Sequence, residues 1–76
     1  MNIEKFIKHL VEQFDEIDPA DVSPTTKFKE LDGWDSLVAI SLIAMVDAEY
    51  GKKLTGDEIR KAQSVSDLFE IVKSKN

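Results

Sequence analysis

The stretch LDGWDSLVAISLIAMVDAEYG, residues 31–51, joins a turn to the longest helical pattern in this chain of 76 residues. Asp32-Gly33 marks the turn, because glycine tolerates the backbone conformations that tight turns require. Asp35 stands at the expected N-cap and Gly51 stands just past the end of the apolar pattern. These signals predict a helix over residues 36–50.

This predicted helix is apolar on more than one face. Its main stripe has the spacing i, i+3, i+4, i+7, i+11 and consists of Ala39, Leu42, Ile43, Val46 and Tyr50. A second apolar set does not fit on that stripe: Leu37, Val38, Ile40, Ala44 and Met45. The helix is therefore either central to a bundle or in contact with something besides its own core.

An amphipathic helix is expected before this segment, and Asn2 can cap it. Its apolar positions have helical spacing: Ile3, Phe6, Ile7, Leu10, Val11 and Phe14. Pro19 disfavours its continuation, so residues 18–35 read as a long loop. Spaced apolar residues along and beside the loop can hold it on a core: Ile17, Val22, Phe28 and Leu31. A loop of this length in a small domain tends to be functional.

Two Ser/Thr-x-x-acid cap signatures, at residues 55–58 and 64–67, predict a short helix ending near Ala62 and a final helix. Together these elements predict an all-α fold: a small four-helix bundle of three longer helices and one short helix, with a long first loop. Residues 1–76 are expected to form a single domain. The expected core is Phe6, Leu10, Phe14, Leu42, Ile43, Val46, Val65, Leu68 and Val72.

Composition excludes several classes of function. The chain has no cysteine, and its 15 acidic against 10 basic residues give a net charge of −5. Such an acidic balance disfavours nucleic-acid binding, which needs a basic face. No apolar run is long enough to span a bilayer and no signal-peptide pattern is present. We expect a cytoplasmic monomer without a membrane partner.

Metal and catalytic sites are not expected. Asp15, Asp18 and Asp21 recur every third residue, which does not match the ligand positions of an EF-hand loop. Without cysteine and with a single histidine, the chain lacks a ligand set for structural zinc. His9 is the sole side chain that ordinarily titrates near neutral pH, and we expect it at the surface. The sequence therefore predicts no catalytic residue and no enzyme.

Ser36 is the most informative polar residue, because the turn places it in the first turn of the longest helix. Serine is common near helix starts, so its position has an ordinary structural explanation. A helix N-terminus also stabilises negative charge, so a phosphate ester on Ser36 would suit this place.

Here the chain resembles the acyl carrier protein family. Asp35-Ser36-Leu37 is similar to that family's attachment motif, and it lies between a glycine-bearing turn and a long helix. The resemblance covers essentially the whole chain, including the first amphipathic helix, the loop with Phe28 and Leu31, and the helix end at Tyr50-Gly51. It implies that Ser36 carries 4′-phosphopantetheine, whose thiol holds acyl or aminoacyl groups as thioesters for lipid, polyketide or related biosynthesis.

The resemblance also implies partners. A phosphopantetheinyl transferase would modify Ser36, and acyl-loading and acyl-processing enzymes would dock nearby. Leu37 is expected to contact partners, and Asp47 is a candidate contact. Ile40 and Ala44 follow Leu37 at i+3 and i+7, where either partner contact or burial against the loop is open. Trp34 either anchors the end of the loop or contacts partners.

Some features depart from the acid-rich second helix that is usual in fatty-acid carriers. Expected outer positions include Val38, Ser41 and Ala48, and Asp47 and Glu49 are the acids after Asp35. A basic cluster surrounds the short helix: Lys52, Lys53, Arg60 and Lys61. A stand-alone peptidyl-type carrier of a dedicated pathway therefore stays open as an alternative, as does an unmodified helical adaptor domain.

Overall fold

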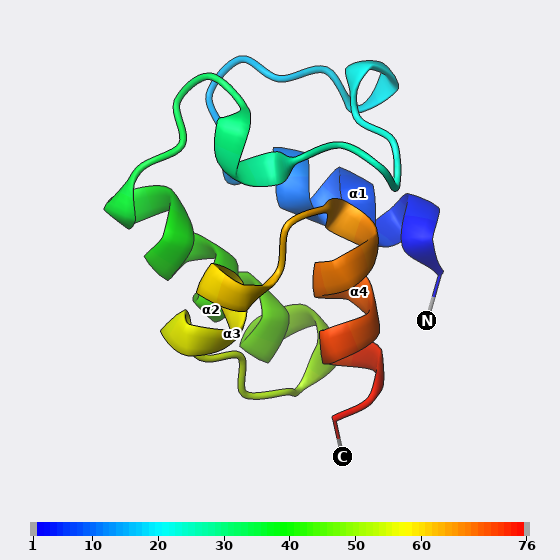
Figure 1. Cartoon of the computed structure of the whole chain (residues 1–76), viewed down its shortest axis with the longest axis vertical. Helices are drawn as coiled ribbons and strands as arrows, with labels where there is room; N and C mark the ends of the chain where they lie inside the picture. The colour runs from blue at the N-terminus through cyan, green and yellow to red at the C-terminus, as the bar shows by residue number, and fades with distance from the viewer. Residues whose placement is uncertain (1, 76) are drawn as a thin grey trace.

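A computed structural model describes residues 2–75 as a bundle of helices with no strand in that range (Figure 1). The helices are α1 (Ile3–Val11), α2 (Ser36–Tyr50), α3 (Gly56–Lys61) and α4 (Val65–Lys73). The predicted all-α bundle of three longer helices and one short helix is confirmed. Two short 3₁₀ turns, Pro19–Asp21 and Phe28–Glu30, lie within the loop that the sequence indicated as irregular.

The helix ends follow the predicted caps. Asn2 Oδ1 accepts the N–H groups of Glu4 and Lys5 at 2.8 and 3.2 Å. Gly51 ends α2 in the left-handed conformation, with φ of 64°, and its N–H donates to the carbonyl of Asp47 at 2.9 Å. Both capping boxes form, at Thr55 and at Ser64. Each cap satisfies backbone groups that a helix terminus leaves without partners.

The core contains all of the predicted residues except Ile43. Eight of its largest side chains are almost fully enclosed: Phe6, Phe28, Leu10, Leu42, Leu68, Val46, Val65 and Val72. Phe14 is also buried, although α1 ends three residues earlier at Val11. Burial of this apolar surface is the main stabilising term of so small a fold.

Our prediction of the inner face of α2 was partly wrong. The buried residues of α2 are Val38, Leu42, Met45 and Val46, a stripe rotated from the one expected. Val38 was expected at an outer position but lies in the core, whereas Ile43 is only partly buried. The reason is tertiary: α2 packs against both α1 and α3, and Ile43 faces a groove between α2 and α3.

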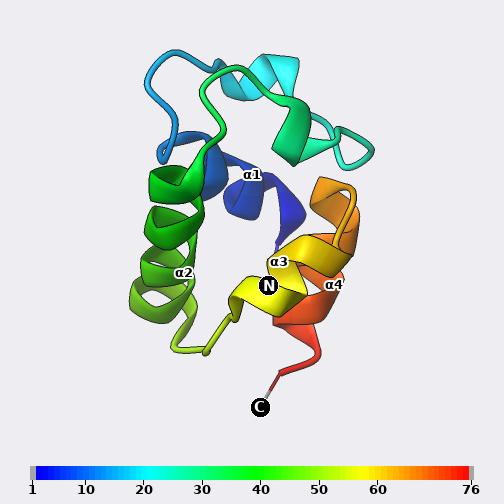
Figure 2. The same ribbon diagram turned by 60° about the vertical axis from the view of Figure 1, so that its left-hand side comes forward.

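The long loop crosses one end of the bundle (Figure 2). As predicted, Val22 and Phe28 are buried and hold it on the core. Two backbone hydrogen bonds also tie it to the start of α4: Val65 N–H donates to the carbonyl of Thr26 at 2.9 Å, and Ser66 N–H donates to that of Pro24 at 2.8 Å. The loop is therefore part of the packed structure.

The expectation that His9 is a surface residue was partly wrong. Its ring is half-buried and meets the Tyr50 ring edge to face, with centroids 5.8 Å apart. Its nitrogens lie 3.6 Å from a Glu12 carboxylate oxygen and 3.8 Å from one of Glu49. Burial, and then the charge of Glu49, raises the pKa of Tyr50. His9 thus joins α1 to the C-terminal end of α2.

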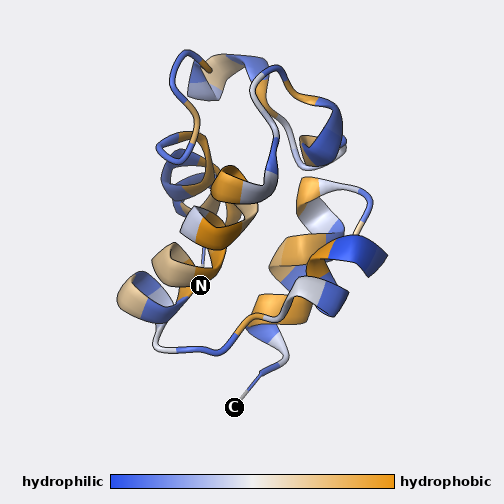
Figure 3. Cartoon of the chain, turned by 90° about the vertical axis from the view of Figure 1, so that its left-hand side faces the viewer, coloured by the Kyte–Doolittle hydropathy of each residue, from blue (hydrophilic) through white to orange (hydrophobic). Residues whose placement is uncertain are grey.

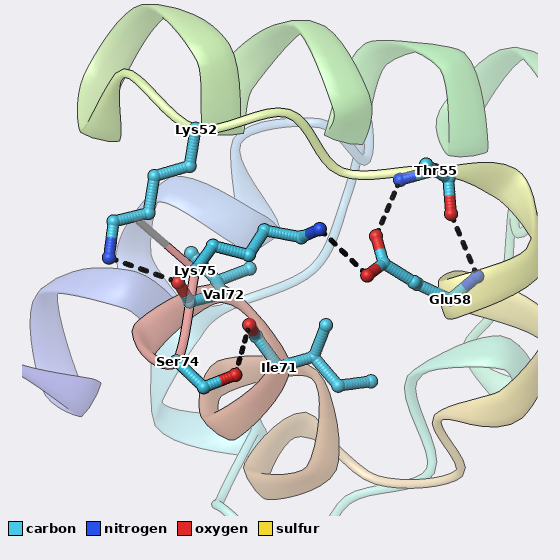
Figure 4. A network of polar contacts seen from close by, with 7 residues as sticks. All are labelled: Lys52, Thr55, Glu58, Ile71, Val72, Ser74 and Lys75. Carbon is cyan, nitrogen blue, oxygen red and sulfur yellow. Dashed lines mark hydrogen bonds and ion pairs between the residues drawn. The ribbon is translucent and has the colours of Figure 1, made fainter.

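A polar network holds α3 against the C-terminal end of α4 (Figure 4). Lys75 Nζ lies 2.7 Å from Glu58 Oε2, while the other Glu58 oxygen accepts the Thr55 N–H at 2.9 Å. The hydrogen bond from Lys75 is the main cause that lowers the pKa of Glu58, followed by that from Thr55. Lys52 Nζ donates to the carbonyl of Val72 at 3.1 Å. These contacts hold α3 and the segment before it against the C-terminal end of α4.

Candidate functional site

Ser36 is the first residue of α2 and is exposed. Gly33, with φ of 91°, turns the chain immediately before it, and Trp34 N–H donates to the carbonyl of Leu31 at 3.1 Å. Asp35 caps the helix, because its Oδ1 accepts the N–H of Val38 at 2.9 Å. Within residues 2–75 the N–H groups of Ser36 and Leu37 have no acceptor. The serine hydroxyl is thus presented at the free, electropositive end of a long helix.

The predicted anchoring role of Trp34 agrees with its packing. Its ring meets the buried Phe28 ring nearly perpendicularly, with centroids 5.5 Å apart, and lies 6.3 Å from the ring of Phe14. Such contacts between aromatic rings add to the free energy gained by burying them. Trp34 is half-buried, so it holds the loop end on the bundle directly before the cap of α2.

Apolar side chains follow Ser36 along an exposed face of α2, whose ribbon is largely apolar (Figure 3). Leu37 is 73% exposed and Ile40 is 62% exposed, the large apolar residues of the described chain that lie most open to solvent. Ala44 is exposed one turn further on. Burial of Ile40 and Ala44 against the loop, one of the two expected possibilities, is therefore wrong. Asp47 is also exposed, and its carboxylate lies 3.6 Å from Lys53 Nζ.

A groove of about 500 Å³, here called the α2–α3 groove, opens beside Ser36. Its walls come from α2, α3 and the end of the loop: Lys29, Trp34, Asp35, Ser36, Ala39, Ile40, Ile43, Gly56, Ile59 and Arg60. Ser36 itself lines the groove, so a group attached to its hydroxyl would start at the groove's edge. The sequence did not predict this groove. It indicated only that Arg60 belongs to a basic cluster around the short helix.

A second depression, here called the acidic hollow, lies on the other side of Asp35 and has a volume of about 520 Å³. The segment that follows α1, the end of the loop and the first turns of α2 form it, and its lining is Gln13, Phe14, Asp15, Glu16, Ile17, Asp32, Gly33, Asp35, Leu37, Val38 and Ser41. Ser36 is not part of that lining. The N-terminal end of α2 therefore separates two depressions of similar size.

The one histidine of the chain lies far from the Ser36 hydroxyl. His9 contacts Tyr50 and Glu49, at the opposite end of α2. From Ser36 to Tyr50 the helix rises about 21 Å, at 1.5 Å per residue. Within residues 2–75 no group of three or more acidic or histidine side chains is placed to hold a metal ion. A serine hydroxyl without a positioned base is a weak nucleophile.

The described helices include none that is long and apolar enough to cross a bilayer. Exposed apolar area is instead concentrated on α2 beside Ser36, where Leu37 and Ile40 lie. An exposed apolar patch is typical of a surface that other proteins contact.

Comparison with known proteins identifies the family to which the chain is similar. The family model described as "Phosphopantetheine attachment site" matches residues 5–72. The chain is similar to the mitochondrial acyl carrier protein of Dictyostelium discoideum, with 33% identity over 84% of this chain and 52% of the relative. Similarity to an acyl carrier protein of Solidesulfovibrio magneticus, at 27% identity, covers 99% of this chain and 96% of that relative.

A third relative, an acyl carrier protein of Thermosynechococcus vestitus, is 29% identical over 91% of this chain and 85% of its own length. The chain thus spans about half the length of the mitochondrial relatives and most of the bacterial ones. No solved structure gives a significant match.

The residues around Ser36 fit a phosphopantetheine. The group needs an accessible hydroxyl for its phosphodiester, and the Ser36 side chain is exposed. Its anionic end is compatible with the free N–H groups of the first turn of α2 and with Lys29 and Arg60 at the groove. The apolar wall formed by Ala39, Ile40 and Ile43 suits the less polar part of the arm.

Proposed function

The chain belongs to the acyl carrier protein family, whose members carry 4′-phosphopantetheine covalently, and we propose that Ser36 is its attachment residue. The observation that supports this assignment is the exposed position of Ser36 at the start of α2, within Asp35-Ser36-Leu37. The attached group supplies a thiol that holds acyl groups as thioesters. The protein is therefore a carrier and not a catalyst.

The attachment step requires a partner enzyme. Ser36 Oγ would attack the β-phosphorus of coenzyme A, forming the Oγ–P bond as the bond to the 3′,5′-ADP leaving group breaks. The hydroxyl proton must pass to a base, and the one histidine of the chain lies at the opposite end of α2. A phosphopantetheinyl transferase would supply that base together with the metal and coenzyme A. What this chain contributes is an accessible hydroxyl and a surface that the transferase can recognise.

The partner surface, in this proposal, runs along α2 from Leu37 through Ile40 to Ala44. The large exposure of Leu37 and Ile40 supports it, since burying one such side chain in an interface gains about 1.5–3 kcal/mol. Trp34 at the edge of the groove and Asp47 further along the helix are the secondary contacts. The transferase, the acyl-loading enzymes and the acyl-processing enzymes would each bind this face in turn.

The pathway is proposed to be a dedicated one. After Asp35, the acids on α2 are Asp47 and Glu49, both near its C-terminal end, so the face beside Ser36 is apolar. That face favours partners that dock through apolar contacts, in lipid, polyketide or aminoacyl chemistry, with a stand-alone peptidyl-type carrier as the alternative. We further propose that residues 1–76 act as a single domain, as a monomer in the cytoplasm.

Intact-mass analysis tests the attachment residue. The protein is incubated with coenzyme A and a phosphopantetheinyl transferase of broad specificity, and wild type should gain one phosphopantetheine. Ser36→Ala should gain none, whereas the matched variant Ser41→Ala, on the same helix, should be modified like wild type. An unmodified wild type, or a label on another serine, contradicts the proposal. An adaptor domain would need no modification and would bind its partner equally well as Ser36→Ala.

A further inference from the structure

Four cations gather at the junction of the loop and α3, and we call them the basic patch. The loop contributes two of them, at and directly before the turn Phe28–Glu30, and the end of α3 contributes the other two on the same side of the bundle (Figure 2). Lys29 Nζ donates a hydrogen bond to the backbone carbonyl of Arg60 at 2.8 Å, which joins the two segments. The basic patch consists of Lys27, Lys29, Arg60 and Lys61.

The tertiary structure divides the basic cluster that the sequence indicates around the short helix. Lys52 Nζ donates to the carbonyl of Val72, in the last turn of α4, at 3.1 Å. Lys53 Nζ lies 3.6 Å from a carboxylate oxygen of Asp47. These two lysines therefore have partners within the fold, whereas the two cations of α3 join the lysines of the loop.

Two carboxylates lie beside the basic patch, and they leave part of its charge uncompensated. Asp57 forms an ion pair with Arg60, one turn later on α3, and both side chains are largely exposed. Glu30 follows Lys29 in the loop. Among residues 2–75, the three lysines of the patch form no ion pair with a carboxylate. Four positive and two negative charges thus gather on one surface of a chain whose net charge is −5.

A small depression of about 130 Å³ opens within the basic patch, lined by Lys27, Lys29, Glu30 and Gln63. Two ammonium groups and one amide provide N–H donors there, and the Glu30 carboxylate opposes them. Lys29 keeps further donors after its bond to the carbonyl, because an ammonium has three. Lys29 is half-buried, so its charge is less screened than that of a fully exposed lysine. The depression therefore favours a carboxylate from another molecule.

The surroundings of the patch disfavour extended polyanions. Leu37 lines the acidic hollow, so an anionic membrane that took up this apolar side chain would meet the carboxylates beside it. Nucleic acid is disfavoured too, because Phe28 is buried and Trp34 packs on it, which leaves no open aromatic ring in the patch for a base to stack on. The hollow is lined by no lysine or arginine and by four carboxylates: Asp15, Glu16, Asp32 and Asp35.

The apolar face of α2 adjoins the basic patch. Ile40, which is 62% exposed, lines the same groove as Lys29 and Arg60. Protein interfaces commonly combine an apolar centre with a polar or charged rim. A protein that covers Ile40 can therefore place acidic side chains on the patch at the same time.

We propose that the basic patch docks an acidic segment of a protein partner, a short stretch whose aspartate and glutamate side chains face the four cations. This polarity is opposite to the one that the net charge of −5 indicates, since the chain as a whole attracts basic surfaces. Because the acidic hollow lies on the other side of Asp35, the acidic segment can bind over the patch and not in the reverse orientation. The inference goes beyond the proposed function, because the patch is complete without any group on Ser36.

Amide chemical shifts of the ¹⁵N-labelled, unmodified protein test this inference, with the synthetic peptide hexaglutamate as the probe. At low salt, hexaglutamate should cause saturable shifts of the amides of residues 27–30 and 60–63. The amides of Asp15, Glu16 and Asp32 in the acidic hollow should stay in place. Hexalysine, a peptide of the same length and opposite charge, should reverse this pattern. Raising salt should weaken the binding of both peptides, because it screens exposed charges.

Charge reversal within the patch gives the matched variants. Lys27→Glu/Lys61→Glu changes two exposed residues and leaves the hydrogen bond of Lys29 in place. It should weaken hexaglutamate binding about tenfold or more, because like charges then face the peptide. Lys5→Glu/Lys73→Glu makes the same change in net charge at exposed positions of α1 and α4, and it should weaken binding far less.

A milder variant guards against loss of the fold. Lys27→Gln/Lys61→Gln removes the two charges without reversing them, and it should weaken hexaglutamate binding in the same direction but to a smaller extent. Circular dichroism establishes that each variant is folded before its binding is compared with that of wild type.

Each outcome decides the inference. Shifts that are confined to the patch and lost on charge reversal support it. The absence of saturable shifts, shifts centred on Lys52 and Lys53, or equal weakening by the patch and control variants overturns it. Tighter binding of hexathymidylate or of phosphatidylglycerol vesicles at the same amides also overturns it, because the occupant would then be a nucleic acid or a membrane. None of these measurements involves loading of Ser36, so this inference and the proposed function can fail separately.

Discussion

The acidic hollow and the α2–α3 groove flank the same helix start and have nearly equal volumes of about 520 and 500 Å³, yet they differ in origin and in charge. The segment between α1 and α2 supplies the carboxylates of the hollow. The turn at Phe28–Glu30 and α3 supply the cations of the groove. The local motif around Ser36 is common to both, so it does not decide the charge on either side. That charge depends on the elements that the fold brings beside the motif.

The largest expected effect comes from Phe28, the buried ring on which both depressions depend. Phe28 is fully buried and meets Trp34, which in turn contacts Phe14 of the acidic hollow. Phe28→Ala should lower the free energy of unfolding by about 3–5 kcal/mol, through lost burial and the cavity left behind. Chemical denaturation measures this loss. Phe28→Ala should also disturb the acidic hollow and the α2–α3 groove together, because Trp34 and Phe14 would lose their support.

The control for this variant is Leu37→Ala, which removes a side chain that is already 73% exposed. Its free energy of unfolding should change by no more than about 0.5 kcal/mol. If the two variants were equally stable, our account of how the loop is held on the core would be wrong.

A smaller effect is expected on partner recognition. Leu37 contributes to the acidic hollow from an exposed apolar position, so Leu37→Ala should lower kcat/KM of the transferase about tenfold, equivalent to about 1.4 kcal/mol of lost contact. Asp47→Asn should have a lesser effect, because Asp47 is exposed and already faces Lys53. Moderate salt should change the rate only modestly. A rate that collapses with salt, or with Asp47→Asn alone, would show that docking is mainly electrostatic.

The smallest effect concerns the α3 wall of the groove and its pH dependence. The pKa of Glu58 is lowered, chiefly by the hydrogen bond from Lys75. A lowered pKa means that the ionised carboxylate stabilises the fold at neutral pH, and that this contribution is lost as the pH falls from about 4.5 through the lowered value. Glu58→Gln should therefore lower Tm slightly at pH 7 and leave it close to wild type in strong acid.

Thermal melts over this pH range, monitored by circular dichroism, measure that difference. Glu70→Gln is the matched control, since Glu70 is an exposed acid on α4, and its melting temperature should follow wild type at every pH. A Tm gap between Glu58→Gln and wild type that stayed constant into acid would contradict the assigned ion pair. Because Glu58 holds α3, Glu58→Gln should also disturb the α2–α3 groove. The acidic hollow, which α3 does not line, should stay unchanged.

The local features of this fold could be predicted because they depend on neighbours within a few positions. The caps at Asn2, Asp35 and Ser64 each use a side chain that reaches a backbone N–H two or three residues away. The turn at Gly33 and the end of α2 at Gly51 need a positive φ that glycine adopts readily. The position of Ser36 at the start of α2 follows from these signals, whereas its role as the attachment residue is implied by the family resemblance.

The buried face of α2 could not be predicted in this way. The helix is apolar on several sides, so its periodicity does not select one stripe over another. Contacts with α1 and α3 made that selection, and they buried Val38 and Met45 while leaving Ile43 at the groove. His9 was misjudged for the same reason, because its partner Tyr50 lies far away in the sequence.

By itself, then, the sequence determined the helices, their caps and the exposed serine at the start of α2, since hydrogen bonds over two to four residues need no distant partner. Only the tertiary structure decided what surrounds that serine. Lys29 and Arg60 are 31 residues apart and meet because the loop and α3 pack on the same side of α2. Charges that far apart in the chain form a common field only when burial of the core has brought them together.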